Sequence, residues 1–182
     1  MASWVFVDLD DTIIDTKSFK QQFFSLLSSR SGKAEEEIVA IYEQKRASIQ
    51  EENWFKDFLQ SLSTLTGFSF PQIERMLNES LRQTQSDQAL LTQIQELKHK
   101  KVLFTYGNQM FQQKKIQLFK LARVFDQVII TNHDKFEVFS DFVRRSPSDN
   151  FILIDNKVSL LTSVKKSFPQ VRSLTKEEFR GG

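Results

Sequence analysis

The sequence predicts an α/β protein in which a parallel β-sheet is flanked by helices and interrupted by a long helical insert. Three observations carry this prediction. Short apolar runs that end in polar residues recur along the chain, as buried parallel strands do. Segments with helical spacing of apolar residues lie between most of these runs, so strand and helix alternate. One stretch, from about residue 17 to about residue 95, has only helical patterns.

Five segments are expected to form the sheet. The first, SWVFVD at residues 3–8, is β-branched and aromatic and ends in a carboxylate. The later ones are VLFT at 102–105, VIIT at 128–131, FILID at 151–155 and a weaker run around Val171. The helix expected after the second strand has Met110, Ile116 and Phe119 at inward spacing. Such alternation gives a parallel sheet with right-handed crossovers.

The helical insert separates the first strand from the rest of the sheet. Its apolar residues recur at spacings of three and four, which predicts several amphipathic helices in succession. Gly67 suits the position just past a helix end, and Pro71 suits a first helical turn. A further helix, from Ser86 to about Lys98, is expected to lead back into the second strand. The chain therefore divides into a core of residues 1–16 and 96–182 and an insert of residues 17–95.

Composition removes several classes of function. The 182 residues are 40% hydrophobic and 26% charged, which describes a globular chain rather than a disordered one. A net charge of +2 is too small for the basic surface of a nucleic-acid-binding protein. The chain has no cysteine and two histidines, so any metal must be held by oxygen. Without a leader-like or membrane-spanning segment, the protein is expected to be cytoplasmic and not bound to membranes.

Three carboxylates, Asp8, Asp10 and Asp11, stand directly after the first strand. In extended backbone Asp8 and Asp10 project to the same side, at the strand end where α/β folds place ligands. A divalent cation with oxygen ligands would neutralise these charges and orient a phosphate oxygen. The same residues would also serve as a helix cap or turn, because aspartate is common in strand-to-helix loops. Spacing alone leaves both interpretations open.

The segment WVFVDLDDTIIDT at residues 4–16 resembles the first motif of haloacid dehalogenase (HAD) superfamily phosphatases. In that family an apolar strand ends in DxDx[TV], often followed by an apolar pair and Asp-Ser or Asp-Thr. The matching residues are Asp8, Asp10 and Thr12 in the motif and Asp15 and Thr16 in its extension. Asp11 stands where the family often has glycine. The resemblance implies a Rossmann-like core with an inserted helical cap, which the insert matches in position and type.

The second and third motifs of the family follow in order. VLFTYGN resembles the second, with Thr105 closing the strand and Gly107 in the following turn. Around the third strand, FDQVIITNHDKF resembles the third motif and supplies Lys135, although Phe136 replaces the usual proline. Lys115, in the helix between these strands, is the rival for the lysine role. The resemblance implies that Thr105 and Lys135 bind phosphate oxygens; read alone, each is an ordinary strand-end or surface residue.

The fourth motif is incomplete. FILIDNKVS resembles it and supplies Asp155 at the end of the fourth strand. The family commonly has Gly-Asp with a second Asp four residues along, or two adjacent acids. Here Ile154 precedes Asp155, Asn156 follows it, and Ser159 occupies the downstream position. This departure bears on the strength or position of metal binding, because fewer charged ligands generally weaken a Mg²⁺ site.

The resemblance implies a Mg²⁺-dependent phosphatase that hydrolyses a small organic phosphate monoester. Asp8 would be the nucleophile that forms an aspartyl-phosphate, and Asp10 the general acid and base. Asp8, Asp155 and the backbone carbonyl of Asp10 would hold Mg²⁺. Dehalogenases of the family lack a carboxylate at the position of Asp10, which favours a phosphate ester as substrate.

Two alternatives to hydrolysis stay open. A phosphomutase would use the same residues if the intermediate outlasted attack by water. A non-catalytic module would keep the fold and bind a partner through its helical insert, as the incomplete fourth motif and the missing Lys-Pro allow. The sequence indicates neither the substrate nor the oligomeric state.

Overall fold

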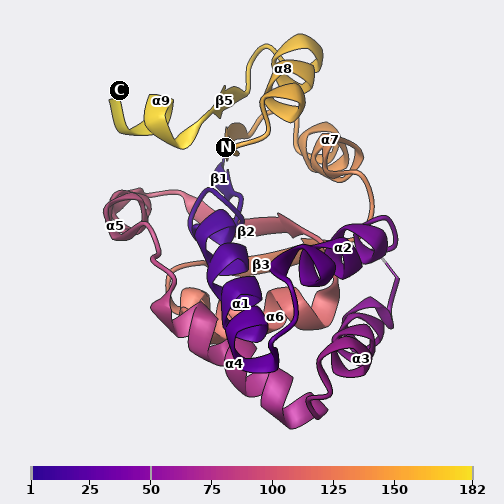
Figure 1. The fold of residues 1–182 in the computed structure, drawn as a ribbon. Helices are drawn as coiled ribbons and strands as arrows, with labels where there is room; N and C mark the ends of the chain where they lie inside the picture. The colour runs from indigo at the N-terminus through magenta and orange to yellow at the C-terminus, as the bar shows by residue number, and fades with distance from the viewer. Residues whose placement is uncertain (1, 50, 182) are drawn as a thin grey trace.

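A five-stranded parallel sheet forms the centre of the molecule, as seen in a computed structural model that describes residues 2–49 and 51–181 (Figure 1). The strand order is β3-β2-β1-β4-β5, and every neighbouring pair is parallel. The bounds are β1 Ser3–Val7, β2 Lys100–Tyr106, β3 Gln127–Thr131, β4 Asn150–Ile154 and β5 Arg172–Leu174. All five predicted strands are therefore present, within a few residues of the predicted bounds.

Helices cover both faces of the sheet, because alternate strand residues point to opposite sides. Val5, Val7 and Leu103 face the layer of α5 and α6, whereas Phe6 and Phe104 face the layer of α7 and α8. The helices outside the insert are α5 Gln88–Glu96, α6 Gln109–Leu118, the short 3₁₀ helix η1 Leu121–Arg123, α7 Lys135–Arg145, α8 Val158–Ser167 and α9 Lys176–Gly181. This is the predicted α/β fold, with its core between the layers.

Four helices make up the insert, and Figure 1 shows them gathered together, away from α8 and α9. They are α1 Thr16–Ser31, α2 Glu35–Arg46, α3 Trp54–Thr66 and α4 Phe70–Gln83. Their inward side chains form a separate hydrophobic cluster rich in aromatic rings, with Trp54 stacked on Phe58 at 5.4 Å between ring centres. As predicted, Gly67 ends α3 in the left-handed conformation, and Pro71 lies in the first turn of α4.

The insert ends earlier than the sequence division at residue 95 predicts. The buried side chains of α5, Leu90, Leu91 and Ile94, pack in the sheet cluster and not with α1 to α4. Just before α5, the chain forms an antiparallel bridge with the loop after β1. The amide of Asp15 donates to the carbonyl of Gln85 at 3.2 Å, and the amide of Asp87 donates to the carbonyl of Ile13 at 2.7 Å. The structural boundary of the insert is thus near residue 84, because the apolar face of α5 is buried against the core.

Helix α6 holds the insert in place over the ends of the strands. Asn108 donates its side-chain amide to the carbonyls of Glu51 at 3.0 Å and Glu52 at 3.2 Å, in the connection between α2 and α3. Phe111 stacks on Phe55 of α3 with ring centres 5.4 Å apart. The loop after β2 and the start of α6 are therefore joined by direct contacts to α3 and to the residues just before it.

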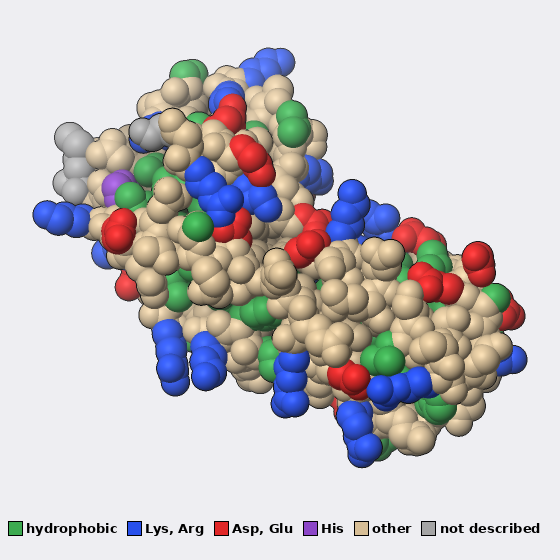
Figure 2. Space-filling view, turned by 60° about the vertical axis from the view of Figure 1, so that its left-hand side comes forward, with side chains coloured by type: hydrophobic (Ala, Val, Ile, Leu, Met, Phe, Trp, Pro, Cys, Tyr) green, Lys and Arg blue, Asp and Glu red, His purple; other side chains and the backbone are tan. Residues whose placement is uncertain are grey.

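The surface carries charges of both signs, and hydrophobic side chains appear only in small separate groups on the face in Figure 2. None of the helices among the described residues has the length and apolar character needed to cross a membrane. Of the helix predicted after β2, Ile116 is buried, but Met110 is 58% exposed and its predicted inward position is wrong. The buried face of α6 carries polar residues in its place, which are described below.

Candidate active site

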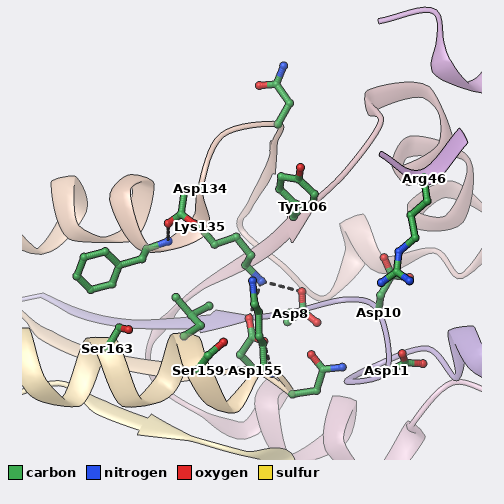
Figure 3. A pocket seen from close by; sticks show the side chains of 15 residues that line it. Asp8, Asp10, Asp11, Arg46, Tyr106, Asp134, Lys135, Asp155, Ser159 and Ser163 are labelled. Carbon is green, nitrogen blue, oxygen red and sulfur yellow. Dashed lines mark hydrogen bonds and ion pairs between the residues drawn. The ribbon is translucent and has the colours of Figure 1, made fainter. Parts of the chain in front are cut away.

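The predicted site residues meet at the carboxyl edge of the sheet. Asp8 follows β1 and Asp155 follows β4, and these strands are neighbours. Lys135 is the first residue of α7, which follows β3. Together with Asp10, the side chains of Asp8, Lys135 and Asp155 line one cavity of about 680 Å³ (Figure 3). The edge is a natural ligand site, because polar side chains at the ends of parallel strands converge there.

Lys135 bridges two carboxylates. Its Nζ donates to Oδ1 of Asp8 at 2.8 Å and to Oδ2 of Asp155 at 2.6 Å. The other oxygen of Asp8 accepts from the hydroxyl of Thr12 at 3.1 Å, and the other oxygen of Asp155 accepts from the amide of Lys157 at 2.8 Å. Of the two lysines considered from sequence, Lys135 is therefore the one that contacts Asp8.

Burial dominates the electrostatics of this cluster. It raises the pKa of Asp8 to about 6; the charge of Lys135 opposes that shift, and the charges of Asp155 and Asp10 add to it. Burial alone would lower the pKa of Lys135, but the charges of Asp8 and Asp155 outweigh it and raise the pKa. The lysine is therefore fully charged, while Asp8 is only partly compensated.

Asp10 has a separate set of partners. Lys115, on α6, donates to Oδ1 of Asp10 at 2.5 Å, and its side chain is only 1% exposed. Thr16 also donates to Oδ1, at 2.5 Å, and Gln112 donates to Oδ2 at 2.8 Å. Burial alone would raise the pKa of Asp10, but the charge of Lys115 and these hydrogen bonds lower it. Asp10 is thus held as an ion by three donors.

The loop between Asp8 and Thr16 is a tight turn. The amides of Ile13 and Ile14 both donate to the carbonyl of Leu9 at 3.0 Å, and the amide of Asp11 donates to the carbonyl of Ile14 at 2.7 Å. Asp11 itself has a φ of 57°, in the left-handed region that glycine and aspartate adopt most readily. Aspartate is therefore tolerated at this position of the turn.

Thr105 lies at the end of β2, next to β1, but it does not line the cavity. Its side chain is fully buried, and its hydroxyl has no hydrogen-bond partner among the described residues. A buried hydroxyl without a partner is unfavourable and is typical of a site that takes a ligand or water. Thr105 therefore lies at the same edge of the sheet as the other site residues but makes no side-chain hydrogen bond to them among the described residues.

Gly107 is required by the turn that follows Thr105. Its φ of 137° is one that residues with a side chain rarely adopt, and a Cβ atom there would lie 3.0 Å from Nε2 of Gln112. The same nitrogen donates to Asp10 and to the carbonyl of Tyr106 at 2.8 Å. The glycine thus allows the close approach that places Gln112 on Asp10.

The donors at the strand ends suit a hard divalent cation. Two carboxylates, Asp8 and Asp155, share Lys135, and the carbonyl of Asp10 belongs to the same loop. Among residues 2–49 and 51–181, no group of three or more His, Cys, Asp or Glu side chains is placed to hold a metal ion. Two carboxylates, a carbonyl and water would form an oxygen site of the kind Mg²⁺ accepts. Burial and the neighbouring carboxylates raise the pKa of Asp8 despite Lys135, and a bound cation would favour its ionised form.

Sequence analysis did not identify Gln112 or Arg46, and it considered Lys115 only as a rival of Lys135 and not as the partner of Asp10. Gln112 and Lys115 are on the buried face of α6, and Arg46 reaches the cavity from the end of α2. Ser159, where the family often has a second acid, also lines the cavity. The helical spacing of three between Gln112 and Lys115 was the available signal, but it points to one shared face and not to what that face contacts.

Comparisons with known proteins agree on the fold. No family model matches the chain, and no similar sequence is found among curated proteins. A Burkholderia xenovorans protein assigned as a HAD-like hydrolase superposes with a TM-score of 0.71 at 19% identity, over 96% of this chain and 81% of that one. A Bacteroides thetaiotaomicron HAD family enzyme, solved with magnesium and inorganic phosphate, gives 0.62 at 15% identity, over 96% and 94%. A Thermotoga maritima protein assigned as a β-phosphoglucomutase gives 0.57 at 13% identity, over 98% and 97%. The chain has the HAD superfamily fold, as its motifs predicted.

Proposed function

We propose that this protein is a Mg²⁺-dependent phosphatase that hydrolyses a small organic phosphate monoester through an aspartyl-phosphate on Asp8. The observation that carries the proposal is the pair of carboxylates that follow β1, which pair with two different lysines. Asp8 is held by Lys135 and Asp10 by Lys115, two residues apart on one loop. Two carboxylates in different surroundings suit two different roles in one reaction.

Asp8 is the nucleophile in this proposal. One of its oxygens attacks phosphorus, forming an O–P bond as the bond to the leaving oxygen breaks. Thr12 and Lys135 each hold an oxygen of the carboxylate, which fixes its direction toward the cavity. Water then attacks the aspartyl-phosphate, which releases phosphate and restores Asp8.

Asp10 moves the protons. Its lowered pKa keeps it ionised at neutral pH, the form that takes a proton from the attacking water. In the first step it must be protonated to donate to the leaving oxygen. A phosphate dianion bound beside it favours that state, because like charge raises the pKa of a carboxyl group.

Lys135 and Thr105 would bind the oxygens of the transferring group. Lys135 is charged and lines the cavity. Thr105 lies outside the cavity lining, and its support is a buried hydroxyl that lacks a partner among the described residues. Mg²⁺, bound by the Asp8 and Asp155 carboxylates and the carbonyl of Asp10, would supply the remaining positive charge against the phosphate oxygens. Aspartate oxygen donors and the incomplete neutralisation of Asp8 support this cofactor.

A small substrate is favoured by the shape of the site. The cavity of about 680 Å³ lies within the range of about 300–1,000 Å³ that small-molecule sites occupy. The insert reaches its edge through Arg46, so a polymer would have to pass α2. The second candidate function is a phosphomutase. It would use the same carboxylates, and the fold is similar to that of a protein assigned as a β-phosphoglucomutase.

The test is release of inorganic phosphate from a panel of phosphorylated small molecules, with and without Mg²⁺. Hydrolysis that needs Mg²⁺ and is lost in Asp8→Asn supports the proposal. Phosphate transfer to a second substrate without release would identify a mutase. Absence of both reactions across the panel, with Mg²⁺ saturating, would favour a non-catalytic module.

A further inference from the structure

Arg46, the last residue of α2, is the part of the insert that reaches the cavity of the site. Figure 3 shows its guanidinium directed toward Asp10 and Asp11, on the opposite side of the cavity from Ser159 and Ser163. Its side chain is 63% exposed. The arginine is therefore presented to the cavity by the fold and is not part of the core.

The carboxylates beneath Arg46 are already bound by other donors. Both oxygens of Asp10 accept hydrogen bonds, from Lys115 and Thr16 on one side and from Gln112 on the other. Oδ1 of Asp11 accepts from the backbone amide of Lys17 at 3.0 Å. Asp10 therefore has a charged partner other than Arg46, and no ion pair among the described residues joins Arg46 to Asp10 or Asp11.

The ion pair that Arg46 does make is weak. It contacts Glu43, one turn earlier on the same helix, at 3.5 Å, and the two side chains are 63% and 54% exposed. Exposed pairs of this kind contribute little, because water screens them and both side chains lose freedom. A ligand anion that covers the guanidinium would be a stronger partner, since arginine binds carboxylate or phosphate with two parallel hydrogen bonds.

The other cations of the site are committed to carboxylates. Lys135 is shared by Asp8 and Asp155, and Lys115 is buried on Asp10. Of the basic side chains that line the cavity, Arg46 and Lys157 are the two that make no ion pair with a site carboxylate among the described residues. Lys157 belongs to the core beside Asp155, whereas Arg46 faces the part of the cavity away from it, beyond Asp10.

We propose that Arg46 binds a second anionic group of the substrate, a carboxylate or a second phosphate, at the end opposite the phosphoryl group that reacts. This inference rests on the proposed function for the position of the reacting group and adds the chemical class of the rest of the substrate. An uncharged alcohol or sugar phosphate fills the cavity without using Arg46. A phosphorylated acid or a bisphosphate uses both charged ends.

The experiment measures binding separately from turnover. The probes are alkyl phosphonates, which cannot be hydrolysed, with a terminal carboxylate separated by two, three or five carbons, each with its matched terminal alcohol. Affinities are measured by titration calorimetry with Mg²⁺ for the wild-type chain, Arg46→Ala and Arg46→Lys. Lys45→Ala removes a neighbouring charge on the same helix that does not line the cavity, and Lys157→Ala removes the other candidate.

We expect the best carboxylate probe to bind at least about tenfold more tightly than its alcohol, the ratio that a charge-assisted hydrogen-bond pair gives. Arg46→Ala should abolish the ratio, Arg46→Lys should keep part of it, and Lys45→Ala should keep all of it. Equal binding of acid and alcohol, binding of neither, or a ratio lost only in Lys157→Ala overturns the inference.

Hydrolysis of the matching phosphate esters by the wild-type chain distinguishes the two proposals. A preference for anionic probes that depends on Arg46, without any hydrolysis, leaves the anion subsite standing and rejects the phosphatase. Hydrolysis with no such preference supports the phosphatase and rejects the subsite.

Discussion

Asp8 and Asp10 are two residues apart on one loop, yet their surroundings move their pKa values in opposite directions. Asp8 shares its lysine with a second carboxylate, and burial raises its pKa to about 6. Asp10 has Lys115 to itself together with two neutral donors, and its pKa is lowered. Burial raises the pKa of both groups, but the Asp8 side chain is 9% exposed and that of Asp10 is 29% exposed. Asp10 also has more donors for its one carboxylate, so its partners outweigh burial whereas those of Asp8 do not.

The negative charge of Asp8 is therefore incompletely balanced by neighbouring donors, whereas that of Asp10 is balanced by Lys115 and its hydrogen bonds. The deficit at Asp8 is where a cation or the reacting phosphate would change the electrostatics most. Asp10, by contrast, is already held at a fixed position by Lys115, Thr16 and Gln112. The predictions below test whether the two neighbourhoods act independently, from the largest expected effect to the smallest.

Removing the proposed nucleophile should have the largest effect. Asp8→Asn keeps the shape of the side chain but removes the attacking oxygen anion, so phosphatase activity should fall by about a thousandfold or more. The protein should stay folded, because Lys135 keeps its partner Asp155. Phosphate release and circular dichroism measure the two outcomes. Asp141→Asn, an exposed aspartate paired with Arg144 at 3.7 Å, is the control; activity of Asp8→Asn equal to this control would remove Asp8 from the mechanism.

Breaking the Asp10 neighbourhood should destabilise the fold. In Lys115→Met, Asp10 loses its charged partner in a buried setting, and the free energy of unfolding should fall by about 3 kcal/mol. The control is the next residue, Lys114→Met, which removes a partly exposed pair with Glu74 at 3.0 Å and should cost less than about 1 kcal/mol. Urea unfolding of both variants measures the difference. Equal losses would mean that the pair between Lys115 and Asp10 contributes no more than a surface contact.

These two lysines also indicate how far the sequence alone could go. The strands were predictable because buried parallel strands are continuous apolar runs, and the aspartates at their ends follow from the motifs. The sequence offered Lys115 only as an alternative to Lys135, and nothing in it separates Lys115, which is 1% exposed, from Lys114, which is 25% exposed and paired with Glu74. Only the packing of α6 against the loop after β1, 105 residues away in sequence, selects Lys115.

The wrong prediction for Met110 has the same origin. Apolar spacing was used to find the inward face of α6, but part of that face holds the polar residues Gln112 and Lys115. Helical periodicity of apolar residues therefore fails where the buried face serves a polar site. The predicted end of the insert differs from the structure for another reason. Helix α5 is amphipathic like α1 to α4, and its sequence does not indicate which hydrophobic cluster its apolar face joins.

The pH dependence of stability should separate the two carboxylates again. Without metal, the folded state keeps Asp8 protonated up to about pH 6, whereas an unfolded carboxyl group ionises near 3.8. The folded state therefore binds more protons in this window, and the Asp8 contribution to the free energy of unfolding falls as pH rises from about 4 to 6. Asp10 has the opposite sign: its contribution is present above its unfolded value and is lost as pH falls below it.

Urea unfolding from pH 3 to pH 7 in a chelating buffer measures both contributions. Relative to the wild-type chain, Asp8→Asn should remove the decline between about pH 4 and 6, and Asp10→Asn should weaken the loss of stability in acid. Saturating Mg²⁺ should also flatten the decline in the wild-type chain, because a cation favours the ionised form of Asp8. A decline that persists in Asp8→Asn would assign it to another group.

The smallest expected effect concerns the fourth motif, where Asp155 has no acidic neighbour. Ser159 lines the cavity on the first turn of α8, the side of the site that lacks the family's second acid. Ser159→Asp adds a carboxylate to the proposed metal site, which has two, and a further charged ligand raises Mg²⁺ affinity. The Mg²⁺ concentration that gives half-maximal activity should therefore fall by about threefold to tenfold.

The matched control is Ser163→Asp, one turn further along α8 on the same cavity, which adds the same charge farther from Asp155. Its half-saturating Mg²⁺ concentration should stay within about twofold of wild type, because solvent and counterions screen a charge that does not coordinate. If the two variants shift the Mg²⁺ titration equally, the effect is long-range attraction and not ligation. If Ser159→Asp leaves the titration unchanged, the metal is held elsewhere and the deficit at Asp8 is offset by the substrate alone.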